Sequence, residues 1–154
     1  MNKPNELTEE TIASLAGFFN TRHDKLLCTA NKNGEPSIAI MGTPRVVSGG
    51  NVEFEISDPV SRTLDNIRDN NAVCLMVYTP AERARDYEGV RIYAKVDDID
   101  NSSEKFEGIK NKIRERHGDE KAAELQATVS CTITDLRPMV DRGQEWDKPP
   151  FGNV

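Results

Sequence analysis

The sequence has too few cysteines and histidines to build the usual thiol or zinc sites. Its three cysteines, Cys28, Cys74 and Cys131, form no Cys-x-x-Cys pair, and neither histidine lies near one of them in the chain. This spacing excludes the common zinc-ligand patterns, so we expect no metal site. Free cysteine is most often a small buried hydrophobe, and we expect all three to pack in strands.

Excess basic charge and long apolar runs are also missing. The net charge is -6, whereas a nucleic acid or an anionic membrane surface requires a basic face. No apolar run approaches the roughly 20 residues of a membrane-spanning helix. The N-terminal sequence MNKPNELTEE lacks the basic and apolar regions of a secretion signal. We therefore expect a cytoplasmic protein that binds neither nucleic acid nor membrane.

What is present is a series of short apolar runs in one domain of 154 residues. Helical spacing predicts a first helix over residues 8–19 and a later one from Ser102 or Ser103 to about His117, ended by Gly118. A barrel region of about residues 25–135 precedes a tail, residues 136–154, with the only tryptophan, Trp146. Six runs have the length or alternation of strands: 26–30, 37–47 with a break at 42–44, 52–57, 72–78, 90–96 and 127–134.

These strands, joined mostly by hairpin turns, indicate an antiparallel sheet rather than a parallel one. Six strands over this length would curl into a barrel, because an open sheet leaves exposed edges. The predicted fold is therefore mainly β with short helices, a six-stranded antiparallel barrel. The charged loop over residues 79–88 is long enough to be a flap.

The segment from Val52 to Asn70 combines a strand with a polar helix start. After the strand, Asp58-Pro59 is typical of a helix N-cap followed by proline at the first helical position. Ser61, Arg62 and Thr63 then fall in the first turn. Two hydroxyls and a guanidinium beside helix amides can hold a phosphate, although the same residues are compatible with an ordinary capped surface helix.

The order of these segments resembles the FMN-binding split barrels, which include pyridoxamine-5'-phosphate oxidases and small bacterial FMN-binding proteins. The resemblance is carried by LLCTANKNGEPSIAIMGTPRVV, VEFEIS, SDPVSRTLDNIRDNNAVCLMVY and GVRIYAKVDDI, with residues 127–134 as the closing strand. It implies a split β-barrel that binds FMN as a homodimer, with the flavin between the subunits.

The resemblance also implies the site. A basic residue flanked by hydroxyls binds the FMN phosphate in this family, at the position of Ser61, Arg62 and Thr63. The flavin ring lies against the strand that corresponds to residues 40–43. The cofactor-binding residues implied are therefore Ile40, Met41, Gly42, Thr43, Ser61, Arg62 and Thr63.

The implied function is that of a flavin-dependent oxidoreductase or electron carrier with a small-molecule or protein redox partner. The tail DLRPMVDRGQEWDKPPFGNV does not reproduce the arginine-rich substrate motif of the pyridoxamine-phosphate oxidases, which argues against vitamin B6 oxidation. No side chain stands out as a catalytic acid, base or nucleophile. Two alternatives stay open: a non-redox protein that binds another phosphorylated ligand, and a member of the same fold that binds haem or a deazaflavin. Trp146 is either a packing residue or a group stacked beside the flavin.

Overall fold

The computed structural model describes residues 7–140; Trp146 and the rest of the tail from residue 141 lie outside them. Its elements in chain order are α1 (Glu9–Phe19), β1 (Lys25–Ala30), β2 (Pro36–Met41), β3 (Arg45–Val47), β4 (Asn51–Ile56), α2 (Arg62–Asp69), β5 (Ala72–Thr79), the 3-10 turn η1 (Ala84–Asp86), β6 (Glu88–Asp100), α3 (Glu104–His117), α4 (Asp119–Glu124) and β7 (Ala127–Pro138). Across residues 7–140, no helix is long and apolar enough to cross a membrane.

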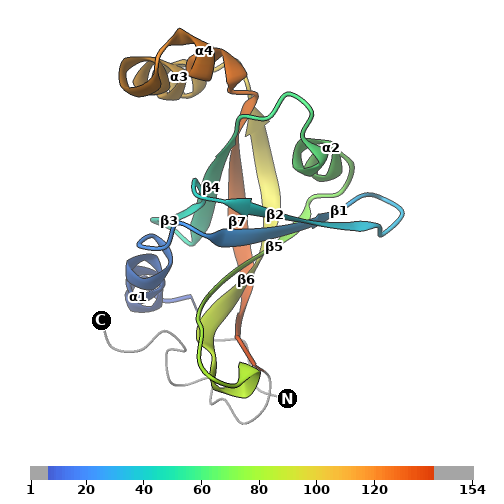
Figure 1. Cartoon of the computed structure of the whole chain (residues 1–154), viewed down its shortest axis with the longest axis vertical. Coiled ribbons are helices and arrows are strands. Elements are labelled where there is room, and N and C mark those ends of the chain that lie inside the picture. Colours follow the sequence, from blue (N-terminus) through green and yellow to red (C-terminus); the bar gives the residue numbers. More distant parts are fainter. Residues whose placement is uncertain (1–6, 141–154) are drawn as a thin grey trace.

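All the strands belong to one antiparallel sheet with the order β2-β1-β5-β6-β7-β4-β3. The two edge strands, β2 and β3, are consecutive in the chain and are joined only by residues 42–44. The sheet must therefore curl until its edges meet. In the view of Figure 1, β2 runs across β6 and β7. The predicted antiparallel split barrel is confirmed. It has seven strands rather than six because the break at 42–44 divides the expected second run into β2 and β3.

The core lies on the concave side of this sheet. Leu27, Leu75, Ile92 and Leu136 follow one another across β1, β5, β6 and β7 as register partners, and all four are buried. Because paired residues point to the same face, one row of apolar side chains spans four strands. α1 adds Leu15 and Phe19 to this core, and α2 adds Leu64 and Ile67.

Serine and threonine caps define where the helices begin. Thr8 accepts from the amide of Thr11 at α1, and Ser103 accepts from the amide of Phe106 at α3, which ends at Gly118 as expected. The expected cap of α2 was wrong. The carboxylate of Asp58 accepts from the Val60 amide within a turn, and Ser61 caps the helix instead. Asp58 is too far upstream because Pro59 and Val60 lie in this turn and not in the helix.

The connection between β6 and β7 is a helical hairpin, α3–α4, at one end of the molecule (Figure 1). Phe106 is buried in α3, and Ala122 and Leu125 are buried in and just after α4. The hairpin therefore has its own small apolar centre, while Ile109 and Ile113 of α3 stay half-buried.

Candidate functional site

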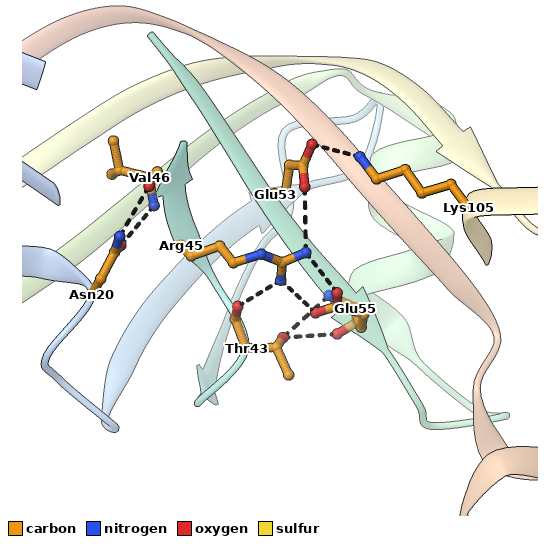
Figure 2. A network of polar contacts seen from close by, with 7 residues as sticks. All are labelled: Asn20, Thr43, Arg45, Val46, Glu53, Glu55 and Lys105. Atoms are coloured by element: carbon orange, nitrogen blue, oxygen red, sulfur yellow. Dashed lines mark hydrogen bonds and ion pairs between the residues drawn. The ribbon is translucent and has the colours of Figure 1, made fainter. Parts of the chain in front are cut away.

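Residues 42–44 form the bulge between β2 and β3, which is fixed by its own Thr43 side chain and by the side chains of Arg45 of β3 and Lys25 of β1; Figure 2 shows Thr43 and Arg45. The Thr43 hydroxyl donates to the Glu55 carbonyl at 3.0 Å and accepts from the Glu55 amide at 3.2 Å. Arg45 donates to the Thr43 carbonyl, and Lys25 donates to the Gly42 carbonyl, each at 3.3 Å. In a regular sheet these backbone carbonyl and amide groups would be paired with a neighbouring strand, and here the side chains satisfy them instead. The bulge is therefore an ordered part of the barrel seam.

Arg45 is the centre of an ion-pair network beside the bulge. Its guanidinium contacts Glu55 at 2.8 Å and Glu53 at 3.3 Å, and Lys105 of α3 reaches Glu53 at 2.6 Å (Figure 2). The hydrogen bond that Arg45 donates to Glu55 and the charges of both carboxylates raise the pKa of Arg45 above its ordinary value. The network neutralises both glutamates and ties the helical hairpin to β4.

A groove of about 400 Å³ lies between this network and α3. Volumes of this size are typical of small-molecule sites. The sheet side supplies polar groups and α3 supplies two half-buried isoleucines and three basic side chains; the lining residues are Thr43, Arg45, Glu55, Ser57, Ile109, Lys112, Ile113, Arg116 and His117.

The charges on α3 divide into partnered and unpartnered groups. Lys105 pairs with Glu53, Arg114 pairs with Asp119 at 2.9 Å, and the Lys110 ammonium lies over the Phe106 ring. Lys112 and Arg116, which face the groove, have no ion-pair partner within residues 7–140.

The groove is therefore positive although the whole chain carries a net charge of -6. Glu55 is compensated by Arg45, and no other acidic side chain lines the groove among the described residues. Cations near a helix C-terminus also offset the negative end of the helix dipole. Cations that only offset the helix dipole need not border a cavity. Lys112 and Arg116, however, border the groove beside the apolar side chains of Ile109 and Ile113. The arrangement suits an anionic ligand with an apolar part.

The predicted phosphate residues lie at the start of α2, four residues beyond Ser57. The Ser61 hydroxyl accepts from the Leu64 amide at 3.1 Å, so it serves as the helix cap. Thr63 is buried, at 8% exposure. Arg62 is exposed and has no ion pair in the part of the chain that the structure describes. Of the three, Arg62 is the side chain most available to a phosphate.

The residues expected along the flavin ring occupy different environments. Ile40 is 74% exposed on β2, and Met41 packs against the core. A Cβ built at Gly42 would lie 3.5 Å from the His23 carbonyl oxygen, an ordinary contact distance, so the fold does not require glycine at this position. Of the seven predicted residues, Thr43 alone lines the groove.

Sequence reasoning missed the α3 side of the groove. The run from Lys110 to Arg116 suggests a solvated charged face, yet Ile109 and Ile113 recur at i, i+4 on the same side as Lys112 and Arg116. This mixture of apolar and basic residues was the available signal. Its partner surface on β3 and β4 becomes visible only in the folded chain.

Metal ligands do not gather in the described structure. No group of three or more His, Cys, Asp or Glu residues that could hold a metal ion is present within residues 7–140. Asp97 accepts from Thr132, and Asp100 accepts from the amides of Ser102 and Ser103. These carboxylates support the strand end and the following loop.

Comparison with known proteins gives a family and a fold. The family model described as pyridoxamine 5'-phosphate oxidase matches residues 14–139. Three solved structures illustrate the fold. An FMN-binding protein from Syntrophomonas wolfei subsp. wolfei is 16% identical with a TM-score of 0.66, over 84% of this chain and 86% of that one. The haem storage protein HutZ from Vibrio cholerae is 18% identical with a TM-score of 0.55, over 78% and 89%. An F420 reductase is 17% identical with a TM-score of 0.57, over 85% and 98%.

These neighbours differ in the ligand that their names specify, and identities this low establish the shared fold alone. No curated protein matches the chain significantly.

Proposed function

The chain belongs to the pyridoxamine 5'-phosphate oxidase family, and we propose that it binds FMN and uses it as an oxidoreductase or electron carrier. The observation that carries the proposal is the positive groove that begins at Thr43 of the ordered bulge and continues beneath α3. FMN requires a place for a dianionic phosphate and a place for a flat ring, and the chain offers a candidate for each.

Arg62 is the proposed phosphate ligand. Its guanidinium is exposed in the first turn of α2, where unpaired helix amides also favour an anion. An arginine can form two parallel hydrogen bonds to a phosphate. The Asp58 carboxylate is held in its own turn by the Val60 amide, which limits its freedom to approach the same anion.

The proposed position of the ring is along the bulge. Gly42 carries no side chain that would stand between a ring and the backbone, and the hydrogen bonds of Thr43 and Lys25 keep that backbone in place. The bound flavin supplies the redox chemistry, and the protein supplies binding and electrostatics. Lys112 and Arg116 then attract an anionic small-molecule redox partner to the groove.

A haem ligand is the second candidate, because His117 lines the same groove beside Ile109 and Ile113. The His117 side chain is exposed, and imidazole nitrogen is a common axial ligand of haem iron. A haem carries carboxylates, which Lys112 and Arg116 would also attract. Haem would occupy the groove, whereas FMN is proposed along the bulge and at Arg62. The ligand that the purified protein carries separates the two candidates.

The deciding experiment is the visible spectrum of freshly purified protein, followed by mass analysis of the ligand released on denaturation. A flavin spectrum with the released mass of FMN supports the proposal, whereas haem or deazaflavin overturns the FMN assignment. Bound flavin should then be reduced by a nicotinamide or a reduced protein partner and reoxidised by an acceptor. Flavin that stays oxidised with every donor would favour a non-redox binding protein.

We also propose a homodimer with the flavin at the subunit interface. Ile38 and Ile40 are 68% and 74% exposed on edge strand β2, and half-buried Leu26 and Met76 continue the same face. Exposed apolar residues that adjoin one another mark an interaction surface. A second copy would cover this face and the ring beside it.

Sedimentation at micromolar concentration tests the assembly. The double substitution Ile38→Asp/Ile40→Asp should give a monomer that loses flavin. Val60→Asp is the matched control, since Val60 is 87% exposed in the loop before α2, and it should remain dimeric. A wild-type monomer that holds stoichiometric FMN would refute the interface site.

A further inference from the structure

Two of the cysteines face each other across neighbouring strands. Cys28 of β1 and Cys74 of β5 are direct register partners, and both are half-buried free thiols on the outer face of the sheet. Opposed residues in an antiparallel pair have Cα atoms about 4.5–5.5 Å apart. A disulfide spans Cα separations of about 4.4–6.8 Å, so the Cα spacing of such a register pair falls within the range that a disulfide bridges.

The ladder that carries this pair is short. β1 and β5 are joined by three register pairs, of which Cys28 with Cys74 is the last. This ladder attaches the hairpin β1–β2 to the remaining five strands of the sheet. A covalent bond here would fasten the hairpin at the end of its ladder.

We propose that Cys28 and Cys74 are a modification site that forms an intramolecular disulfide on oxidation by a hydroperoxide. One thiolate attacks hydrogen peroxide, which breaks the O–O bond and leaves a sulfenic acid while the second oxygen departs as water. The other thiol then attacks the sulfenic sulfur, forms the S–S bond and releases a second water. In total two thiols and one hydrogen peroxide give one disulfide and two waters, and both thiols are oxidised.

Tyr93 and Arg91 are the two groups that favour the thiolate of Cys74. The Cys74 thiol donates to the Leu75 carbonyl at 3.9 Å, and Tyr93, its register partner on β6, lies nearby. Arg91 on the same strand adds a positive charge nearby. These two groups favour the thiolate, whereas burial and Cys28 oppose it more strongly and raise the pKa of Cys74 to about 11. Oxidation is therefore slow at neutral pH, and the disulfide once formed is hard to reduce.

Cys131 provides an internal comparison. It is fully buried on the core side, and its register partners are Val52 and Val96. No thiol lies opposite it, so the same oxidant finds no partner for a second step. The inference therefore concerns one defined pair among three cysteines.

The proposed dimer would cover the face that carries both thiols, so the test uses the full-length protein diluted until it sediments as a monomer. This protein is treated with hydrogen peroxide, and its peptides are mapped by mass spectrometry without reduction. We expect one crosslink between the peptides of Cys28 and Cys74, with a loss of two hydrogens that dithiothreitol reverses. Cys131→Ala should give the same crosslink, Cys28→Ser should abolish it, and Tyr93→Phe should slow it several-fold. Sulfinic or sulfonic acids without a crosslink, a bond that involves Cys131, or a bond between two chains would overturn the proposal. The wild-type map decides the question even if a serine variant does not fold.

The structural consequence is measured on the oxidised protein. Its melting temperature should exceed that of the reduced protein by several degrees, because the bond encloses the chain between residues 28 and 74. A lower melting temperature would show that the bond strains the sheet and would contradict the proposed fastening.

Discussion

The buried ammonium of Lys25 donates a hydrogen bond to the Gly42 carbonyl at 3.3 Å. The two residues flank the pairing of β1 with β2, since Lys25 is the register partner of Met41. The ammonium also lies over the ring of Phe19. Burial lowers the pKa of Lys25, Arg45 adds to the effect, and Asp24 opposes it. The hydrogen bond from the buried Lys25 ammonium therefore fixes the Gly42 carbonyl from the core side of the bulge.

Replacing Lys25 with methionine should therefore loosen the bulge. The Gly42 carbonyl would lose its partner while the apolar stem is kept, and the expected destabilisation is about 1–3 kcal/mol in urea unfolding. Flavin affinity should fall in parallel. Lys32→Met is the control, since Lys32 lies exposed in the turn before β2, and it should leave both unchanged. A loss of stability with unaltered flavin affinity would show that the bulge does not contribute to flavin binding.

Arg62→Ala should weaken FMN at least tenfold and riboflavin hardly at all. A hydrogen bond to a charged group contributes about 1.5–3 kcal/mol, and 1.4 kcal/mol corresponds to a factor of ten. Fluorescence titration of the apoprotein with both ligands measures the difference. Arg68→Ala, in the last turn of the same helix, should bind both normally. Equal losses for FMN and riboflavin would refute the phosphate assignment without affecting the fold.

The double substitution Lys112→Ala/Arg116→Ala should remove the preference of the groove for anions. With bound flavin reduced chemically, kcat/KM for the anion ferricyanide should fall at least tenfold, while that for the neutral quinone menadione should change little. Lys110→Ala is the matched control because Lys110 lies over Phe106. A similar fall with both acceptors would indicate damage to the flavin site.

Two glycines should respond to alanine in opposite directions. At Gly89 a Cβ would lie 2.3 Å from the Val77 carbonyl oxygen and 2.7 Å from the Tyr78 Cα, and Gly89→Ala should cost about 2–3 kcal/mol. At Gly108 in α3 a Cβ meets nothing within 4 Å, so Gly108→Ala should stabilise by about 0.5–1 kcal/mol. Thermal and urea unfolding measure both. A tolerated Gly89→Ala would contradict the close approach of β5 and β6.

Alkaline pH should destabilise the fold through Cys131. Burial, with a smaller contribution from Asp97, raises its pKa from 9.0 to about 12. Above pH 9 the unfolded chain loses this proton while the folded chain keeps it, so the free energy of unfolding decreases as pH rises from about 9 to 12. Between about pH 8.5 and 10.5 the decrease should be about 2 kcal/mol.

Cys131→Ala is the comparison, measured by urea unfolding across the same range. The variant should be less stable at neutral pH because a buried group is removed. Its free energy of unfolding should, however, decrease by about 2 kcal/mol less than that of the wild type between about pH 8.5 and 10.5. Parallel curves for the two proteins would show that the thiol titrates alike in both states.

The sequence predicted the parts of this molecule that local patterns specify. Alternation at Val52, Phe54 and Ile56 gave β4, and the stripe of Ile12, Leu15 and Phe19 gave α1. The start of α2 was misplaced because Asp58 and Ser61 are both good caps three residues apart, and only packing of Leu64 and Ile67 selects between them.

The groove could not be predicted because its walls are far apart in the chain. Thr43 and Arg116 lie on different elements, and the facing thiols of Cys28 and Cys74 depend on the register of β1 against β5. Residue patterns reveal which face of a strand is apolar but not which strand lies beside it. The expectation that all three cysteines are small buried hydrophobes fits Cys131 but not Cys28 and Cys74, which are half-buried.

The three-residue link from Met41 to Arg45 has a mechanical consequence. β2 and β3 form opposite edges of the sheet, and the short link couples their motions. When one edge strand moves away from the sheet, it pulls on the other. A ligand seated at the bulge would therefore damp the opening of both edges at once. Amide hydrogen exchange should slow together in β2 and β3 when the site is filled, although these strands share no ladder.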